Sequence, residues 1–247
     1  MKRRPAQNVL APEEAEYARS LVLHEDAHML VFNKPSGLAV QGGSGITRSL
    51  EDMLAAFAKS SGKRPRLVHR LDRETSGVIV AARTRPAAAF LSEAFAGRTV
   101  EKVYLALVCG GAPEPREGEI NLALRKANRS GLDIMEIDPA GQPALTRYRT
   151  LAESRQAALL ELRPETGRMH QLRAHLAAIG RPIAGDGKYG GLFRLGTVEI
   201  GRLMLHAAAL ELPHPAGGRR RFGAPLPTDM AEPLRSLGLE PTCGAHS

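Results

Sequence analysis

Apolar positions group into short runs along the first half of the chain. Three compact runs predict buried strands, each bounded by turn residues or charges: residues 29–32, 78–82 and 103–108. Two longer segments place apolar residues at helical spacing and therefore predict helices: residues 47–60 and 86–96. The first of these helices carries Leu50, Leu54 and Phe57 on one face, and Gly97 follows the second as its stop.

In the second half of the chain the apolar period changes to two, which is typical of half-buried strands. Two runs alternate with polar residues: Ile120, Leu122 and Leu124, then Ala158, Leu160 and Leu162. A helix is expected from Thr166, its N-cap, with an apolar stripe of Met169, Leu172, Leu176 and Ile179, and a late strand at 203–212. Because strands and helices do not alternate strictly, we expect an α+β fold with a mixed, mostly antiparallel sheet and flanking helices.

The chain of 247 residues is long enough for one large domain. We expect a short tail at residues 1–20, which ends in a polar helical turn, one domain at 21–240 and a C-terminal tail at 241–247. No apolar run reaches the ~18 residues that a membrane span needs, and no signal-peptide core follows the basic N-terminus. A cytoplasmic protein without a membrane partner is therefore expected.

Charge is the first indication of a partner. Lys and Arg number 34 against 26 Asp and Glu, a net charge of +8, which favours a polyanion such as nucleic acid. The basic residues gather mainly in four segments: 2–4, 63–73, 125–129 and 219–221. A solvated surface that only aids solubility is the alternative at this point. With 6 Phe, 4 Tyr and no Trp, stacked aromatic platforms for single-stranded nucleic acid are not expected.

Metal sites find little support in the sequence. The two cysteines, Cys109 and Cys243, form no Cys-x-x-Cys pair. His24, Glu25 and His28 match the His-Glu-x-x-His zinc pattern, which requires a helix. Here an apolar run and a turn follow directly, and in an extended segment four residues span ~13 Å, too far for two ligands of one zinc ion. No metal and no cofactor are therefore expected.

Asp72 is the candidate with the clearest chemistry. It lies in a turn between two apolar runs, and Arg70 and Arg73 on either side favour its ionised form. An ionised, partly shielded carboxylate is suited to act as a nucleophile or as an electrostatic stabiliser. The alternative is a turn aspartate whose side chain is bonded by Thr75 and Ser76.

The segment from His69 to Gly77 resembles the His-Arg-Leu-Asp-x-x-Thr-Ser-Gly signature of the RluA family of pseudouridine synthases. Four further blocks follow the family in the same order: residues 25–37, the Lys102-x-Tyr104-x-Ala106 block, residues 165–189 and the closing block 205–207. The glycine-rich segment 41–45 is most similar to the RluC branch, which acts on large-subunit ribosomal RNA. Members of that branch usually carry an N-terminal S4 domain, and only the short tail precedes the first block here. Either this form lacks that domain or the sequence starts inside a longer chain.

The resemblance implies an isomerase that needs no cofactor, built as one catalytic domain with a central RNA-binding cleft. It aligns Asp72 with the essential aspartate, Tyr104 with the active-site tyrosine and Arg173 with the arginine that pairs with the aspartate. Of the substrate-binding candidates, Arg70 aligns with the arginine that enters the RNA and Leu172 with the aliphatic residue against the base. His69 and Leu205 lie in two of the matching blocks and complete the set.

Physical reasoning from the residues agrees with this interpretation. A base cannot be rebuilt inside a stack, so the target must be flipped out, and a guanidinium plane such as that of Arg70 can stack in its place. Leu172 and Arg173 are ~100° apart on the predicted helix, and a buried arginine there needs a carboxylate, for which Asp72 is the obvious candidate. We therefore expect a monomeric RNA pseudouridine synthase acting on 23S ribosomal RNA, with transfer RNA as an alternative substrate. A non-catalytic RNA-binding protein and a zinc hydrolase are the two alternatives outside this class.

Overall fold

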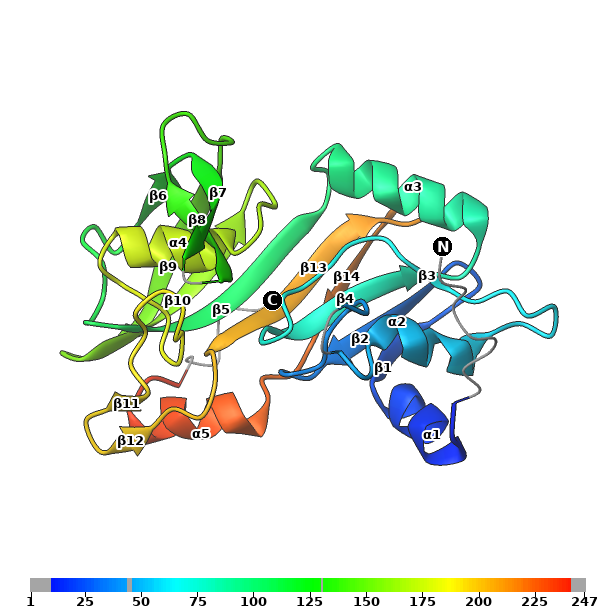
Figure 1. Cartoon of the computed structure of the whole chain (residues 1–247), viewed down its shortest axis with the longest axis horizontal. Coiled ribbons are helices and arrows are strands. Elements are labelled where there is room, and N and C mark those ends of the chain that lie inside the picture. Colours follow the sequence, from blue (N-terminus) through cyan, green and yellow to red (C-terminus); the bar gives the residue numbers. More distant parts are fainter. Residues whose placement is uncertain (1–9, 44–45, 130, 241–247) are drawn as a thin grey trace.

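One mixed sheet of ten strands forms the framework of the computed structural model, which describes residues 10–43, 46–129 and 131–240 (Figure 1). Its strands are β1 (Val22–Glu25), β2 (Met29–Lys34), β3 (Arg66–Leu67), β4 (Ser76–Ala82), β5 (Glu101–Cys109), β6 (Glu117–Asn121), β9 (Leu145–Glu153), β10 (Ala157–Pro164), β13 (Leu205–Pro213) and β14 (Arg219–Gly223). They are ordered β1-β2-β4-β13-β5-β10-β9-β6, with β14 paired to β13 and β3 to β4. Only β4 and β13 run parallel among these described strands. The expected α+β fold with a mixed, mostly antiparallel sheet is confirmed.

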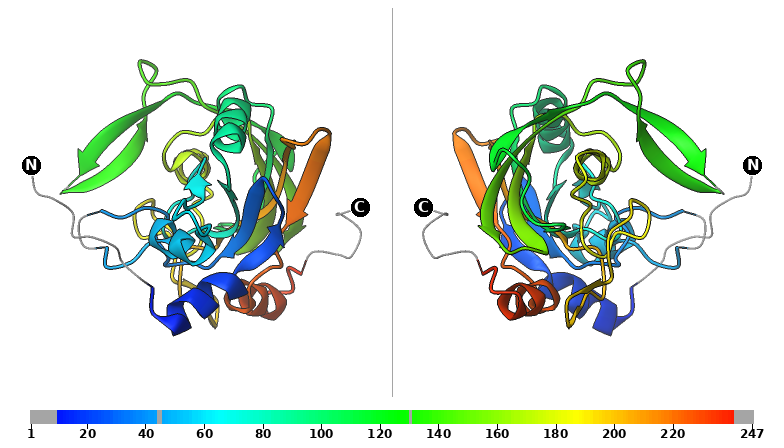
Figure 2. Two further views of the ribbon diagram at one scale, coloured as in Figure 1. Left: turned by 90° about the vertical axis from the view of Figure 1, so that its right-hand side faces the viewer. Right: turned by 90° about the vertical axis from the view of Figure 1, so that its left-hand side faces the viewer.

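Helices and two small hairpins surround this sheet. The helices are α1 (Pro12–Ser20), α2 (Leu50–Met53), the 3-10 helix η1 (Leu54–Phe57), α3 (Arg85–Ala96), α4 (Gln171–Ala178) and α5 (Thr228–Ser236). The hairpins are β7 (Leu124–Arg129) with β8 (Leu132–Ile137), and β11 (Arg194–Leu195) with β12 (Val198–Glu199). Figure 2 shows the β7–β8 hairpin standing away from the rest of the molecule. None of the helices in the described ranges is long and apolar enough to cross a membrane.

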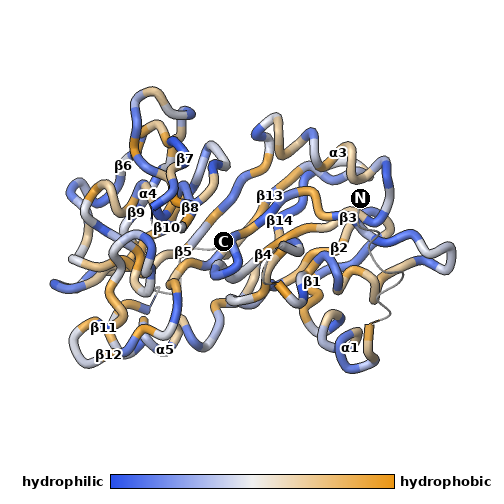
Figure 3. Tube along the Cα trace, viewed as in Figure 1, coloured by the Kyte–Doolittle hydropathy of each residue, from blue (hydrophilic) through white to orange (hydrophobic). Residues whose placement is uncertain are grey.

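The strands β2 and β4 are buried on both faces, which explains why their sequences are continuous apolar runs. Alternate residues such as Val31 and Val80 pack against α3, whereas Phe32 and Ile79 pack toward α2 and η1. Figure 3 shows the resulting hydrophobic centre along β2, β4 and β13. Burying each such side chain stabilises the fold by roughly 1.5–3 kcal/mol relative to exposure.

A second core forms around β5 and β10, where the simple alternation predicted for β10 is wrong. All six residues from 157 to 162 are buried, because side chains of α4 and α5 pack into the same cluster. The polar residue among them, Glu161, is 5% exposed and bonds to Arg149 and Arg163. The period-two pattern of the sequence therefore predicted too few buried residues in this strand.

Two predicted helix limits are also wrong, each for an identifiable reason. The helix predicted at 47–60 starts later, because Ser49 caps it with Asp52, and after Met53 the chain continues as the 3-10 helix η1. The helix predicted from Thr166 begins at Gln171, after a left-handed residue at 170, so Met169 is 38% exposed. The end predicted for α3 is confirmed, since the helix stops at Ala96 with Gly97 as its C-cap; the left-handed residue that follows is Arg98.

The parallel pair β4–β13 depends on a glycine. Gly77 has φ +114°, and a Cβ atom there would lie 2.1 Å from the backbone oxygen of Ala207. Because no side chain fits this approach, Gly77 allows β13 to lie directly beside the end of the Asp72 loop. Residues 44 and 45 of the glycine-rich segment, the first nine residues and the C-terminal tail with Cys243 lie outside the described residues.

Candidate active site

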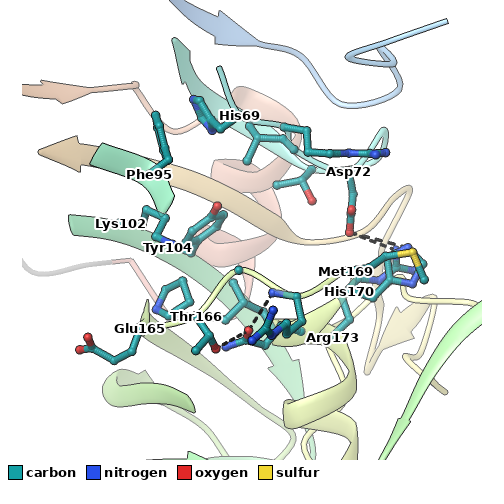
Figure 4. A pocket seen from close by; sticks show the side chains of 18 of the residues that line it. His69, Asp72, Phe95, Lys102, Tyr104, Glu165, Thr166, Met169, His170 and Arg173 are labelled. Atoms are coloured by element: carbon teal, nitrogen blue, oxygen red, sulfur yellow. Dashed lines mark hydrogen bonds and ion pairs between the residues drawn. The ribbon is translucent and has the colours of Figure 1, made fainter. Parts of the chain in front are cut away.

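A cavity of about 530 Å³ opens between the β3–β4 loop, the end of α3, the start of β5 and the segment before α4. All seven residues that the sequence identifies line it: Asp72, Tyr104, Arg173, Arg70, Leu172, His69 and Leu205. These residues come from four separate parts of the chain, and Figure 4 shows several of them around one space. The volume lies in the range of small-molecule sites and is large enough for one nucleotide.

Asp72 reaches into this cavity from a loop that is tied to the body of the fold. Lys34 is fully buried, and its ammonium group donates to three backbone carbonyls, including that of Arg73 at 3.1 Å. The amide of Gly37 donates to the same carbonyl at 2.9 Å. Burial lowers the pKa of Lys34 to about 7, while the charges of Glu74 and Asp72 act in the opposite direction. The loop that carries Asp72 is therefore fixed by a lysine that the sequence did not single out.

The carboxylate of Asp72 is 27% exposed and faces the cavity. Within the described ranges no donor hydrogen-bonds to it, so the alternative of a turn aspartate bonded by Thr75 and Ser76 is not found; Ser76 bonds to His206 instead. The flanking arginines do not pair with it either: Arg73 donates to the carbonyl of Gly37 at 3.0 Å. A carboxylate without hydrogen bonds is available to a ligand.

Two basic side chains, from α4 and from the residue before it, approach this carboxylate. Nη1 of Arg173 lies 3.7 Å and Nε2 of His170 lies 3.9 Å from Oδ2 of Asp72, as the dashed lines of Figure 4 indicate. Both distances are too long for hydrogen bonds. Nη1 of Arg173 is buried and has no hydrogen-bond partner in the described part of the chain. The expected pairing of Arg173 with Asp72 is thus present as an ion pair only.

The two-point contact of Arg173 is made with Asp186, which the sequence analysis missed. Nε and Nη2 each donate to one oxygen of Asp186 at 2.7 Å, and both side chains are buried, at 4% and 0% exposure. Burial works against the charge, but the bonds to Asp186 outweigh it and raise the pKa of Arg173. Gly185 makes this position possible, because at φ +76° a Cβ atom there would lie 1.9 Å from the backbone oxygen of Arg202. Gly185 and Asp186 lie inside the 165–189 block, and this match to the family could have pointed to Asp186.

Tyr189 connects this arrangement with the β7–β8 hairpin. Its hydroxyl accepts a hydrogen bond from the amide of Met135 in β8 at 2.7 Å and lies 3.0 Å from Nδ1 of His170. Its ring lies 5.2 Å from the guanidinium carbon of Arg173. One aromatic side chain therefore contacts both groups that approach Asp72.

Tyr104 lies in β5, opposite Leu162 of β10 and Ala207 of β13. Burial raises the pKa of Tyr104, and the negative charge of Asp72 adds to the effect. The phenol is therefore neutral at neutral pH and presents a ring and a hydroxyl to the cavity. Leu172 and Leu205, at 7% and 3% exposure, supply apolar lining.

His69 is held by the protein as well as lining the cavity. Its Nε2 accepts a hydrogen bond from the amide of Val80 at 2.9 Å, and its ring stacks on Phe95 at a centroid distance of 4.2 Å. Burial lowers the pKa of His69 to about 3, so the ring is neutral. Its predicted contact with substrate stays a prediction, and Arg70 is the exposed neighbour that faces solvent.

The zinc alternative fails on geometry. His24 lies in β1, and His28 lies in the turn before β2, so no helix joins them. His24 and His214 both contact Oδ2 of Asp26 at 2.9 Å. No group of three suitable metal ligands occurs in the ranges that the structure describes. His175 and His206 are buried and hydrogen-bonded to the framework.

Comparison with known proteins agrees with this site. The family model described as RNA pseudouridylate synthase matches residues 28–178. Ribosomal large subunit pseudouridine synthase C of Vibrio cholerae is 38% identical over 220 residues, which cover 87% of this chain and 69% of the relative. The protein of the same name from Escherichia coli is 38% identical over 224 residues, with 88% and 70% covered.

Solved structures agree with the sequence relatives. Human RNA pseudouridylate synthase domain containing 4 superimposes with a TM-score of 0.77 at 30% identity, covering 92% of this chain and 98% of the human chain. Human RNA pseudouridylate synthase domain containing 1 gives a TM-score of 0.69 at 28% identity, covering 83% of both chains. The chain therefore belongs to the RNA pseudouridylate synthase family and is an isomerase that converts uridine in RNA to pseudouridine.

Proposed function

We propose that this enzyme forms pseudouridine in large-subunit ribosomal RNA, with Asp72 as its central catalytic residue and Tyr104 and Arg173 as its partners. The observation that carries the assignment is the carboxylate of Asp72, which faces a nucleotide-sized cavity without a hydrogen bond in the described residues. The ribosomal substrate rests on the names of the relatives from Vibrio cholerae and Escherichia coli. Residues 21–240 are proposed as the catalytic domain.

The reaction breaks the bond between N1 of uracil and C1′ of ribose and forms a bond from C5 to C1′. The hydrogen on C5 leaves as a proton, and N1 gains a proton, so the substrate and product are isomers. The sum of these steps needs no co-substrate, and we propose no metal or cofactor. Since ribosomal RNA is made inside the cell, the proposal places the enzyme in the cytoplasm, as a monomer.

Each residue has a proposed task that follows from its surroundings. The target uridine flips out of the RNA into the cavity, and Arg70 stacks in the space that it leaves. The ionised carboxylate of Asp72 acts on the sugar as nucleophile or base. Tyr104 and Leu172 pack against the detached uracil, and Arg173 orients Asp72 through their ion pair.

The test is Asp72→Asn, assayed by tritium release from ribosomal RNA carrying [5-³H]uridine. The amide keeps the shape of the side chain but cannot act as an anion, so we expect loss of product with RNA affinity largely retained. Product formation at the normal rate would remove Asp72 from the mechanism. Mapping of pseudouridine in ribosomal and transfer RNA, from cells with and without the protein, decides between the two substrate classes.

A further inference from the structure

Arg98 has a backbone conformation that an arginine rarely adopts. In the described residues, Arg98 (φ +58°) and His170 (φ +49°) are the non-glycine residues with positive φ, and both line the cavity. Arg98 follows the end of α3, where the left-handed residue is usually glycine. Strained residues of this kind gather at functional sites, where the side chain matters more than the backbone cost.

Lys102 lies near Arg98 on the same wall. It is two residues before Tyr104 in β5, so the two side chains share one face of the strand, and Figure 4 shows them side by side. Its ammonium nitrogen lies 4.0 Å from the Cβ position at Gly167, on the segment that crosses the cavity. Burial lowers the pKa of Lys102; the charge of Glu165 opposes this, and the charge of Arg98 adds to it.

Neither cation has an acidic partner. Within the described ranges no carboxylate oxygen lies within 4.0 Å of the charged nitrogens of Arg98 or Lys102, and Glu165, which also lines the cavity, pairs with Arg147. On the projecting hairpin, by contrast, Arg125, Lys126 and Arg129 each form an ion pair. Two neighbouring cations that form no ion pair repel each other, and an anion between them removes this cost.

We propose that Arg98 and Lys102 form a phosphate subsite, which holds a backbone phosphodiester of the RNA beside the uridine in the cavity. The proposal rests on the proposed function for the identity of the RNA. Asp72, Tyr104 and Lys102 follow one another across the cavity, so sugar, base and phosphate of one nucleotide can each meet a matching group. Arg98 lines the same cavity and its positive charge acts on Lys102, so a second cation lies close to this place.

A purely structural explanation makes the opposite prediction for stability. A cation at the C-terminus of α3 is favourable with the helix dipole, and Arg98 would then act within the protein only. In that case Arg98→Gly lowers the melting temperature and leaves RNA binding unchanged. For a phosphate ligand, Arg98→Gly relaxes the left-handed backbone, so the melting temperature stays equal or rises while RNA affinity falls.

The experiment compares Arg98→Gly, Lys102→Gln and the control Arg155→Gln, which removes an exposed charge that has no ion pair in the described residues and lies outside the cavity. We measure affinity for a large-subunit ribosomal RNA transcript at several KCl concentrations, together with the melting temperature. Losing one phosphate contact weakens binding about tenfold or more and reduces the salt slope by about one. The control keeps the slope of the wild type.

Chemically altered RNA identifies the group that is bound. A single uncharged methylphosphonate linkage is placed on either side of the uridine that the wild type modifies. At one position it should weaken binding to the wild type but have no effect on Lys102→Gln. The proposal is overturned if neutral linkages weaken both proteins equally, or if Arg98→Gly destabilises the protein with an unchanged salt slope. Absence of pseudouridine formation by the wild type would reject the proposed function alone, since the salt slopes still decide on the subsite.

Discussion

Asp186→Asn tests whether the buried pair between Asp186 and Arg173 holds the catalytic arrangement together. The substitution keeps the size of the side chain but removes its charge and replaces one acceptor oxygen with a donor. One of the two 2.7 Å bonds from Arg173 then faces an NH₂ group. The guanidinium, 4% exposed, is left with Asp72 at 3.7 Å as its nearest carboxylate.

The expected magnitude follows from this burial. Breaking a buried ion pair by removing one partner costs about 3–5 kcal/mol, because the remaining charge is not solvated. For a domain of this size each kcal/mol lowers the melting temperature by roughly 2–4 °C, so we expect a decrease of roughly 6–20 °C. Turnover should fall as well, since a guanidinium released from Asp186 no longer holds a fixed position beside Asp72.

The matched control is Asp229→Asn. Asp229 receives the same two-point contact from Arg202, at 2.7 and 2.6 Å, but is 60% exposed. An exposed pair contributes at most about 1 kcal/mol. Thermal unfolding and single-turnover tritium release are measured for both variants. Equal stability losses, or full turnover in Asp186→Asn, would refute the assignment of Asp186 as the group that positions Arg173.

Three further outcomes are expected. Burial lowers the pKa of His206 from 6.5 to about 4, so between these pH values the unfolded chain binds a proton that the folded chain does not. The free energy of unfolding should therefore decrease as the pH is lowered from 6.5 to 4, by about 1.4 kcal/mol per pH unit. An equal decrease in His206→Gln would contradict this. Tyr189→Phe should leave the buried amide of Met135 unsatisfied, at a cost of about 1–3 kcal/mol, with faster hydrogen exchange at that amide; unchanged exchange would count against the link. Arg173→Lys should lower the single-turnover rate more than RNA affinity, because an ammonium cannot make the two-point contact, and an effect on affinity alone would place Arg173 in RNA binding instead.

The sequence predicted the buried strands and seven of the residues that line the cavity. Continuous apolar runs identify strands covered on both faces wherever they occur, and β2 and β4 are found where these runs predict them. The motif around Asp72 and the block that holds Arg173 are short runs of adjacent residues, so they can be identified from the sequence alone. The resemblance built on these blocks therefore brought Asp72, Tyr104 and Arg173 together correctly as lining of one cavity.

The partners of these residues were decided by the tertiary structure. Arg173 makes its two hydrogen bonds with Asp186 rather than with Asp72, because Gly185 lets the chain that carries Asp186 approach Arg202 closely. Gly185 and Arg202 are both far from Asp72 in the sequence. The late start of α4 and the left-handed conformation of Arg98 were likewise not indicated by the local sequence pattern. Local patterns record whether a residue is buried, but hydrogen-bond partners and backbone strain are set by contacts between distant segments, whose energies outweigh local propensity.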